Sequence, residues 1–172
     1  VFTQTGGFDS YFKYKVIIST NAKDFGGHPL AAGLSWTFTT IMNHDQAYSV
    51  TAGDGETRVD LEPGPFGDDN YYVVINTSPA LSARINSANS KVNNSTDEFF
   101  MPIEGTLREV DSYKGSPLTV SNESFSSDVE ITIPYIMDGL YVKGTSPPVR
   151  EETLAVYWLN EDNSIWVRIP GS

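Results

Sequence analysis

The chain has 172 residues and a formal net charge of −11, from 22 acidic and 11 basic residues. Such an anionic surface disfavours nucleic acid, because phosphates are bound by clustered Lys and Arg, and it disfavours an anionic membrane for the same reason. Divalent cations are natural partners of this charge, although negative charge also simply keeps a protein soluble. The absence of cysteine excludes disulfides and thiolate chemistry.

The first ten residues, 1–10, are expected to form an arm ahead of a single β-sandwich domain at 11–172. The arm combines apolar and Thr/Gln residues with a flexible Gly6-Gly7 pair, and it is the candidate donor strand for a neighbouring subunit. Its donor residues are Val1, Phe2, Thr3, Gln4 and Thr5. A chain that begins at Val1 rather than Met also suggests that a leader has been removed.

Apolar and polar residues alternate along most of the chain, which is the period of a half-buried β-strand. The segment 12–18 places apolar residues on one face, with Lys13 and Lys15 on the other, and Trp36 and Phe38 share one face of the next strand. The predicted strands lie at residues 12–18, 35–42, 58–61, 70–76, 81–85, 98–103, 105–111, 117–120, 129–135, 154–158 and 165–169.

Two segments depart from this alternation. Residues 70–76 are apolar on both faces, which predicts a central strand. Residues 86–97 are mostly polar, which predicts a loop. About ten short strands joined by turn-rich links predict an all-β fold, an antiparallel β-sandwich or jelly roll with little or no helix.

The sequence offers little catalytic chemistry. The only histidines are His28, in a Gly-Gly-His-Pro loop, and His44, in an Asn-His-Asp turn, and neither lies near a G-x-S-x-G elbow. Two distant histidines do not supply a zinc site, and no pair of acids is marked as a glycosidase pair. We therefore expect a protein that is not an enzyme.

Calcium is the one metal that the acidic turns favour, because it takes hard oxygen ligands from loops. The first candidate site is Asp68, Asp69 and Asn70, where adjacent carboxylates repel unless a cation or hydrogen bonds offset them. Two further candidates are Asp54 with Glu56 and Asp60, and the turn 160–163. The alternative interpretation is that Asp and Asn are ordinary turn residues here.

Aromatic residues and glycosylation motifs suggest contacts with sugars. Trp36, Trp158 and Trp166 are candidates for a carbohydrate-stacking platform, although the core between two sheets is the commoner place for such residues. Four Asn-x-Ser/Thr triplets give possible glycosylation sites in a secreted protein. They begin at Asn76, Asn93, Asn94 and Asn122. No apolar run reaches the roughly 20 residues that span a bilayer, so no membrane span is expected.

The last 45 residues or so resemble a C-terminal β-sandwich module of bacterial and archaeal extracellular surface proteins. The resemblance rests on an ITIPY strand, an acidic turn, an LxVYxW-like strand and a hairpin that closes on W-V-x-x-P. These are residues 131–135, Glu151-Glu152, 154–158 and 166–170. The module implies an extracellular or cell-surface β-sandwich and transfers no catalytic residue. More loosely, residues 76–79 resemble part of secreted fibre subunits.

The module usually continues with another strand, whereas this chain stops at Ser172, so we expect a sandwich with an unpaired edge. Such an edge invites pairing with another chain, and a neighbour's strand can fill it. Repeated head-to-tail, this contact gives an open filament. The sequence therefore predicts an extracellular structural protein whose partners are copies of itself. The alternative is a secreted module that binds carbohydrate or a cell-surface component, with calcium as an optional clamp.

Overall fold

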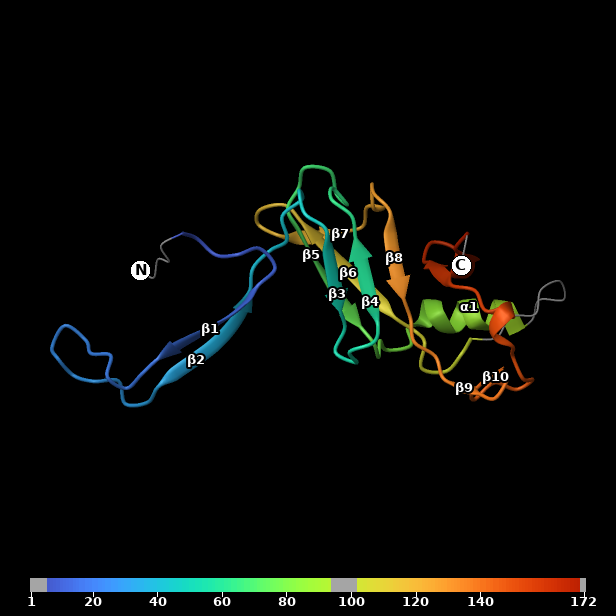
Figure 1. Ribbon diagram of the computed structural model, residues 1–172, viewed down its shortest axis with the longest axis horizontal. Helices are drawn as coiled ribbons and strands as arrows, with labels where there is room; N and C mark the ends of the chain where they lie inside the picture. The colour runs from blue at the N-terminus through green and yellow to red at the C-terminus, as the bar shows by residue number, and fades with distance from the viewer. Residues whose placement is uncertain (1–5, 94–101, 171–172) are drawn as a thin grey trace. The chain divides into compact units, whose positions relative to one another are not determined.

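The structure is a computed structural model that describes residues 6–93 and 102–170 (Figure 1). Within these residues it contains twelve short strands, one α-helix and one 3-10 helix, so the predicted all-β class is confirmed. The strands are β1 (Lys13–Ile18), β2 (Leu34–Thr39), β3 (Tyr48–Thr51), β4 (Arg58–Leu61), β5 (Tyr71–Asn76), β6 (Glu109–Lys114), β7 (Thr119–Ser121), β8 (Val129–Thr132), β9 (Met137–Asp138), β10 (Tyr141–Val142), β11 (Tyr157–Asn160) and β12 (Ile165–Arg168). The helices are α1 (Ala83–Asn93) and the 3-10 helix η1 (Glu151–Thr153).

The described strands form five small sheets. Three are two-stranded: β1–β2, β9–β10 and β11–β12. Two are three-stranded, with the orders β3-β4-β8 and β5-β6-β7. The chain divides into two compact units, unit 1 (residues 1–48, 60–73 and 112–129) and unit 2 (residues 49–59, 74–111 and 130–172).

The core of unit 1 is aromatic. The ring of Phe66 lies 5.7 Å from that of Tyr71 and 5.1 Å from that of Phe125, and Met42 is fully buried. Tyr71 belongs to β5, which stands at one end of its sheet, so the prediction that residues 70–76 form a central strand was wrong. Tyr71 is buried all the same, because its ring packs against those of Phe66 and, at 6.1 Å, Tyr48. Met42 bridges Tyr71 through two backbone hydrogen bonds of 2.8 and 3.2 Å.

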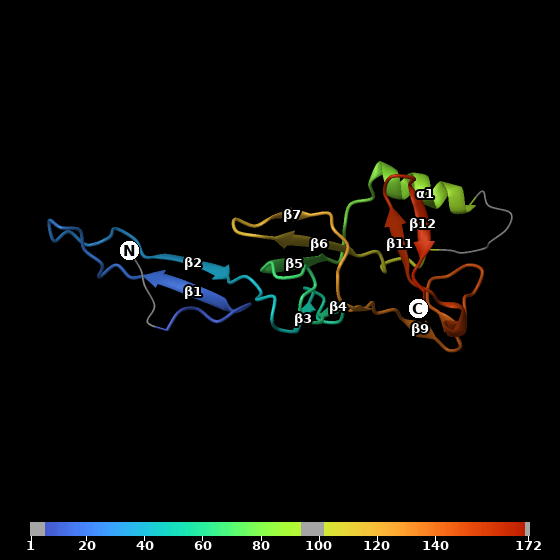
Figure 2. The same ribbon diagram turned by 90° about the horizontal axis from the view of Figure 1, so that it is seen from above.

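Unit 2 contains the one described α-helix, at a place where the sequence predicted a strand and then a loop. The Ser82 hydroxyl caps α1 by accepting a hydrogen bond from the Ile85 amide at 3.2 Å. Ile85, Ala88 and Val92 recur at spacings of three and four residues, which places them on one face. That face is the more buried one, and α1 packs on β12 (Figure 2). The segment is therefore a helix whose apolar residues recur with the helical period, and the apparent alternation at 81–85 does not make a strand.

The C-terminal strands are shorter than the sequence predicted. β8 ends at Thr132, two residues before Pro134, which cannot donate a ladder hydrogen bond. The predicted strand at 154–158 begins only at Tyr157, after η1. The predicted strand at 98–103 lies mostly outside the described residues, and its last two residues are not in a strand.

Candidate functional site

The β1–β2 hairpin presents an apolar face that is only partly covered. Its register pairs Tyr14 with Phe38, Val16 with Trp36 and Ile18 with Leu34, and directly paired residues share a face. We call these six residues, with Phe12, the hairpin face. The alternation predicted for residues 12–18 is confirmed. The outer part of the face is open, since the side chain of Trp36 is 49% exposed and that of Leu34 is exposed as well.

Aromatic rings close the inner part of the hairpin face. The Phe8 ring lies 4.8 Å from Tyr14 and 5.5 Å from Phe38, in edge-on geometry, and the Tyr14 and Phe38 rings stack at 5.6 Å. These contacts stabilise the ribbon locally, because edge-on and offset aromatic pairs are favourable. They leave Trp36 and Leu34 without a comparable aromatic contact among the described residues.

The opposite face of the hairpin is polar apart from the exposed Ile17, and it carries the positive charge of the hairpin. Lys13 and Lys15 lie there beside Ser35, Thr37 and Thr39. Residues 13–39 contain three lysines and one aspartate, a net charge of +2, so the rest of the chain carries −13. The hairpin is therefore a cationic element in a strongly anionic protein.

The tip of this hairpin is an ordered loop with an exposed aromatic residue at its apex. Asp24 closes the loop: its carboxylate accepts from the His28 amide at 2.9 Å and contacts the His28 ring at 3.2 Å. These hydrogen bonds, that of the backbone amide first, lower the pKa of Asp24. Gly27 has a φ of +84°, a backbone conformation that favours glycine, whereas a Cβ at Gly26 would meet only the exposed His28 ring at 2.9 Å, which can move aside. Phe25, which lies between Asp24 and Gly26, is fully exposed.

A second exposed apolar surface lies on the β9–β10 hairpin of unit 2. Ile136 is 66% exposed and Leu140, in the two-residue turn, is 75% exposed. We call the following residues the β9–β10 patch: Tyr135, Ile136, Met137, Leu140 and Tyr141. Asp138-Gly139 between apolar runs is a strong hairpin signal, so the sequence contains a local indication of this element.

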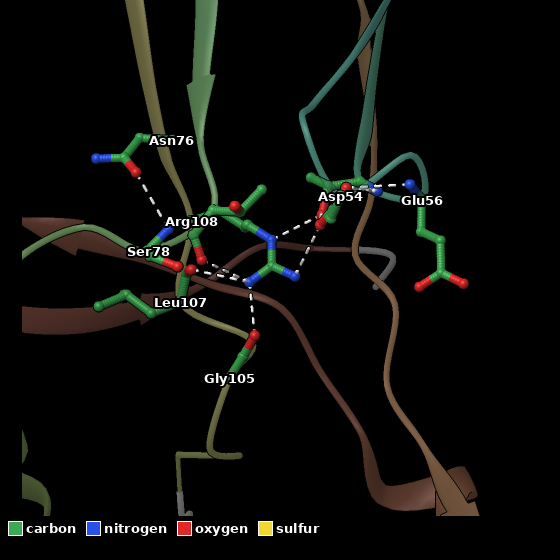
Figure 3. A network of polar contacts seen from close by, with 9 residues as sticks. Asp54, Glu56, Asn76, Ser78, Gly105, Leu107 and Arg108 are labelled. Atoms are coloured by element: carbon green, nitrogen blue, oxygen red, sulfur yellow. Dashed lines mark hydrogen bonds and ion pairs between the residues drawn. The ribbon is translucent and has the colours of Figure 1, made fainter.

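A network of polar contacts in unit 2 surrounds Arg108 (Figure 3). The guanidinium donates to the Thr57 hydroxyl at 2.7 Å, to the Gly105 carbonyl at 2.6 Å and to the Leu107 carbonyl at 3.0 Å, and it pairs with Asp54 at 3.4 Å. The side chain of Arg108 is only 8% exposed, and Thr57 is fully buried. Hydrogen bonds, above all that from the Thr57 hydroxyl at 2.6 Å, lower the pKa of Asp54. The network ties the β3–β4 turn to the segment before β6.

The Arg108 network includes one predicted calcium candidate, Asp54. Its carboxylate faces a cation and three donors from Glu56 and Thr57 rather than other carboxylates. A turn aspartate that accepts from the amides two and three residues later is a common local motif. The local geometry therefore explains the position of the Asp54 carboxylate, and calcium binding by Asp54 stays a prediction.

The first-choice calcium residues lie in an exposed turn of unit 1. Asp69 is 3.6 Å from the Lys114 ammonium, and the Asn70 side chain accepts from the His44 amide at 3.4 Å. Asp68 is exposed. Lys114 also bonds Glu123 at 2.6 Å, which raises the pKa of Lys114. The repulsion between the two adjacent carboxylates is thus offset in part by a protein cation, and calcium binding stays a prediction.

The third acidic turn, residues 160–163, is held against α1. Glu161 pairs with Arg84, and Lys91 donates to the Asn163 carbonyl at 2.5 Å. The Asn160 side chain accepts from the Asn163 amide at 3.2 Å, which closes the turn. Across residues 6–93 and 102–170, no three His, Asp or Glu side chains gather closely enough to ligate one metal ion.

The three tryptophans do not form one platform. Trp158 pairs with Val167 and Trp166 with Leu159, so the two tryptophans point to opposite faces of β11–β12. The Trp166 indole donates to the Asn89 side chain at 2.8 Å on the α1 side. Trp158, on the other face, is 49% exposed, as Trp36 is on β2.

The possible glycosylation sites differ in their surroundings. Asn76 is exposed, but its amide group donates to Glu109 at 3.0 Å and accepts from the Ser78 amide at 3.1 Å. Asn122 is exposed in the loop after β7. The side chain of Asn93, the whole of Asn94 and the donor residues Val1 to Thr5 lie outside the described residues.

Each histidine ring contacts the carboxylate of a nearby aspartate. His28 contacts Asp24, and the His44 ring lies 3.0 Å from the Asp45 carboxylate. No helix in the described part of the chain is both long and apolar enough to cross a bilayer. No family model, curated protein or solved structure matches this chain. The resemblance of its last 45 residues to a surface-protein module therefore stays a prediction.

Proposed function

We propose that this chain is an extracellular structural subunit that assembles with copies of itself, with the β1–β2 hairpin as a contributing element. The observation that carries the proposal is the half-exposed hairpin face on a two-stranded ribbon. A two-stranded hairpin alone is marginally stable in water and needs a further strand or another element against its apolar face. Each of its two strands also has an outward edge that can pair with another chain.

Charge favours a second copy as the partner. The hairpin carries a net charge of +2 and the rest of the chain −13. The hairpin of one copy is therefore attracted to the remainder of another copy, which has the opposite charge. Complementary charges speed association and select partners. The same anionic surface opposes nucleic acid and anionic lipid. In this proposal the arm of residues 1–10 is a further candidate donor, and no catalytic role is assigned.

Two matched tryptophan variants test the proposal. Trp36→Thr removes the largest side chain of the hairpin face, and Trp158→Thr removes a tryptophan of equal exposure, 49%, from another hairpin. We expect wild type to associate with rising concentration in sedimentation velocity and to give filaments in negative stain. Trp36→Thr should weaken association about tenfold or more, as the loss of an interface hot spot does. A wild type that is monomeric at all concentrations would refute the proposal.

The exposed Trp158 supports a second candidate function, binding of carbohydrate or a cell-surface component. An exposed aromatic face can stack on an apolar sugar face. Glycan-array binding that is lost in Trp158→Thr but kept in Trp36→Thr would favour this candidate. The reverse pattern, with assembly lost only in Trp36→Thr, would favour self-assembly.

A further inference from the structure

We infer that the surface that receives the β1–β2 hairpin is the β9–β10 patch of a second copy. This inference rests on the proposed function and adds the site where the neighbour binds. It makes the contact heterologous, because two different surfaces of the chain meet. A heterologous contact that does not close into a ring repeats without limit and forms an open filament.

The distribution of exposed apolar side chains supports this pairing. Single exposed hydrophobic residues are normal on a protein surface, whereas clusters mark interaction sites. Ten of the eighteen exposed large apolar residues of the described chain lie in two such clusters. One is the β1–β2 hairpin with its tip, and the other is the β9–β10 patch, which places five such residues within residues 135–141.

Charge also matches the two surfaces. Lys23 flanks the tip loop of the hairpin, and Lys13 and Lys15 line its polar face. Around the β9–β10 patch, residues 135–153 contain three acids and two bases, a net charge of −1. Asp138 is exposed in β9 and the exposed Glu151 accepts a hydrogen bond from Tyr135, whereas Lys143 and Arg150 pair along the backbone with Ile136 and Tyr141. A hairpin–hairpin contact between two copies would instead bring like charges together.

In this contact, Phe25 at the tip of the hairpin is the side chain that inserts into the neighbouring copy. The Asp24–His28 hydrogen bonds order the backbone of the loop, so less backbone freedom remains to be lost when Phe25 is buried. Preorganised aromatic side chains are typical interface hot spots. Phe25 and the outer part of the hairpin face together form the "head", and the β9–β10 patch forms the "tail".

A mixing experiment tests the head-to-tail contact. The head-deficient variant is Phe25→Ser with Trp36→Thr, and the tail-deficient variant is Ile136→Thr with Leu140→Ser. All four substituted side chains are exposed, so circular dichroism should show that each variant folds as wild type does. The control is Trp158→Thr. Each variant alone should lose filaments, with association weakened at least about tenfold.

Equal amounts of the two variants should form a 1:1 dimer and nothing larger. The intact head of one can bind the intact tail of the other, and both remaining surfaces are defective. Sedimentation velocity distinguishes this result from the alternatives. Filaments that persist in the tail-deficient variant, or a mixture that stays monomeric, would overturn the inference while wild-type assembly leaves the proposed function standing. A wild type that binds phosphatidylcholine vesicles through Phe25 and never self-associates would overturn both.

Discussion

The Arg108 network and the β1–β2 hairpin differ in whether their interactions are completed within one chain. In the network a charged side chain is 8% exposed and meets acceptors from three directions, so its burial is compensated within unit 2. In the hairpin an apolar face stays half exposed on a ribbon of two strands. Satisfied buried polar groups need nothing further, whereas an open apolar face gains free energy when it is covered.

The residues of the two regions differ in what they stabilise. Arg108, Thr57 and Asp54 stabilise the fold of one chain, so their substitution should lower the free energy of unfolding. Trp36 and Phe25 contribute little to that fold and, in the proposed function, act between chains. The free energy of unfolding of the monomer distinguishes residues that stabilise one chain from residues that act between chains.

The largest loss is expected for Arg108→Met. The substitution removes the hydrogen bonds that the largely buried guanidinium donates to the Thr57 hydroxyl and to the Gly105 and Leu107 carbonyls, and it removes the cation beside Asp54. A hydrogen bond from a charged group contributes about 1.5–3 kcal/mol, so the loss of several should cost about 3 kcal/mol or more, which urea denaturation followed by circular dichroism measures. The control is Arg84→Met, whose pair with Glu161 is exposed and which should change stability by about 0.5 kcal/mol or less. Equal losses in both variants would contradict a special role for the network.

A somewhat smaller effect is expected from the ionisation of Tyr71. Its side chain is fully buried, and burial, with a smaller contribution from Tyr48, raises the pKa of Tyr71 to about 12. The unfolded chain releases this proton near pH 10 and the folded chain only near 12, so stability is complete below pH 10 and falls as the pH rises between these values. The expected loss is up to about 2–3 kcal/mol.

Tyr71→Phe is the control for that pH dependence. The Tyr71 hydroxyl is buried and has no hydrogen-bond partner among the described residues. The variant should therefore lose the part of the alkaline destabilisation due to Tyr71 and gain about 1 kcal/mol at neutral pH, because an unsatisfied polar group is removed. Urea denaturation at pH 7 and pH 11 checks both effects, and a variant less stable than wild type at pH 7 would show that the hydroxyl is satisfied in solution.

The cap of α1 gives a prediction of about 1 kcal/mol. Ser82→Ala removes the hydroxyl that accepts from the Ile85 amide, and loss of a serine N-cap costs about that much. Ser87→Ala, on the exposed side of the same helix, should instead stabilise by a few tenths of a kcal/mol (~0.3), because alanine has the higher helix propensity. The two alanine substitutions thus have opposite signs if α1 forms as described.

The parts of the fold that were predicted correctly are those with strict alternation. Lys13 and Lys15 opposite an apolar face define β1 without help from the rest of the chain, and β2 follows from Trp36 and Phe38 in the same way. α1 was missed because serine and asparagine are poor helix formers and its apolar stripe is short. Its stability comes from contact with β12, and such a tertiary contact has no local signature.

The candidate site was harder to predict than the strands. The sequence showed the residues of the hairpin face, but an alternating strand is normally buried on its apolar side, and exposure depends on whether another element covers it. Arg108 carried no signal either, since its acceptors come from segments as far away as Asp54 and Thr57. The tip loop had a readable pattern: two glycines between Phe25 and His28 indicate a tight turn with an outward aromatic residue.

A small change in unfolding is expected for Trp36→Thr, the variant with the largest expected change in assembly. Half of the Trp36 side chain already faces water, and threonine keeps the strand propensity, so the monomer should lose about 1 kcal/mol, well below the loss for Arg108→Met. Urea denaturation must be done at a concentration where wild type is monomeric, because association would stabilise wild type alone. A loss as large as that of Arg108→Met would mean that the hairpin face belongs to the core. A small loss of stability together with a tenfold weaker association would mean that Trp36 stabilises the contact between chains more than the fold of one chain.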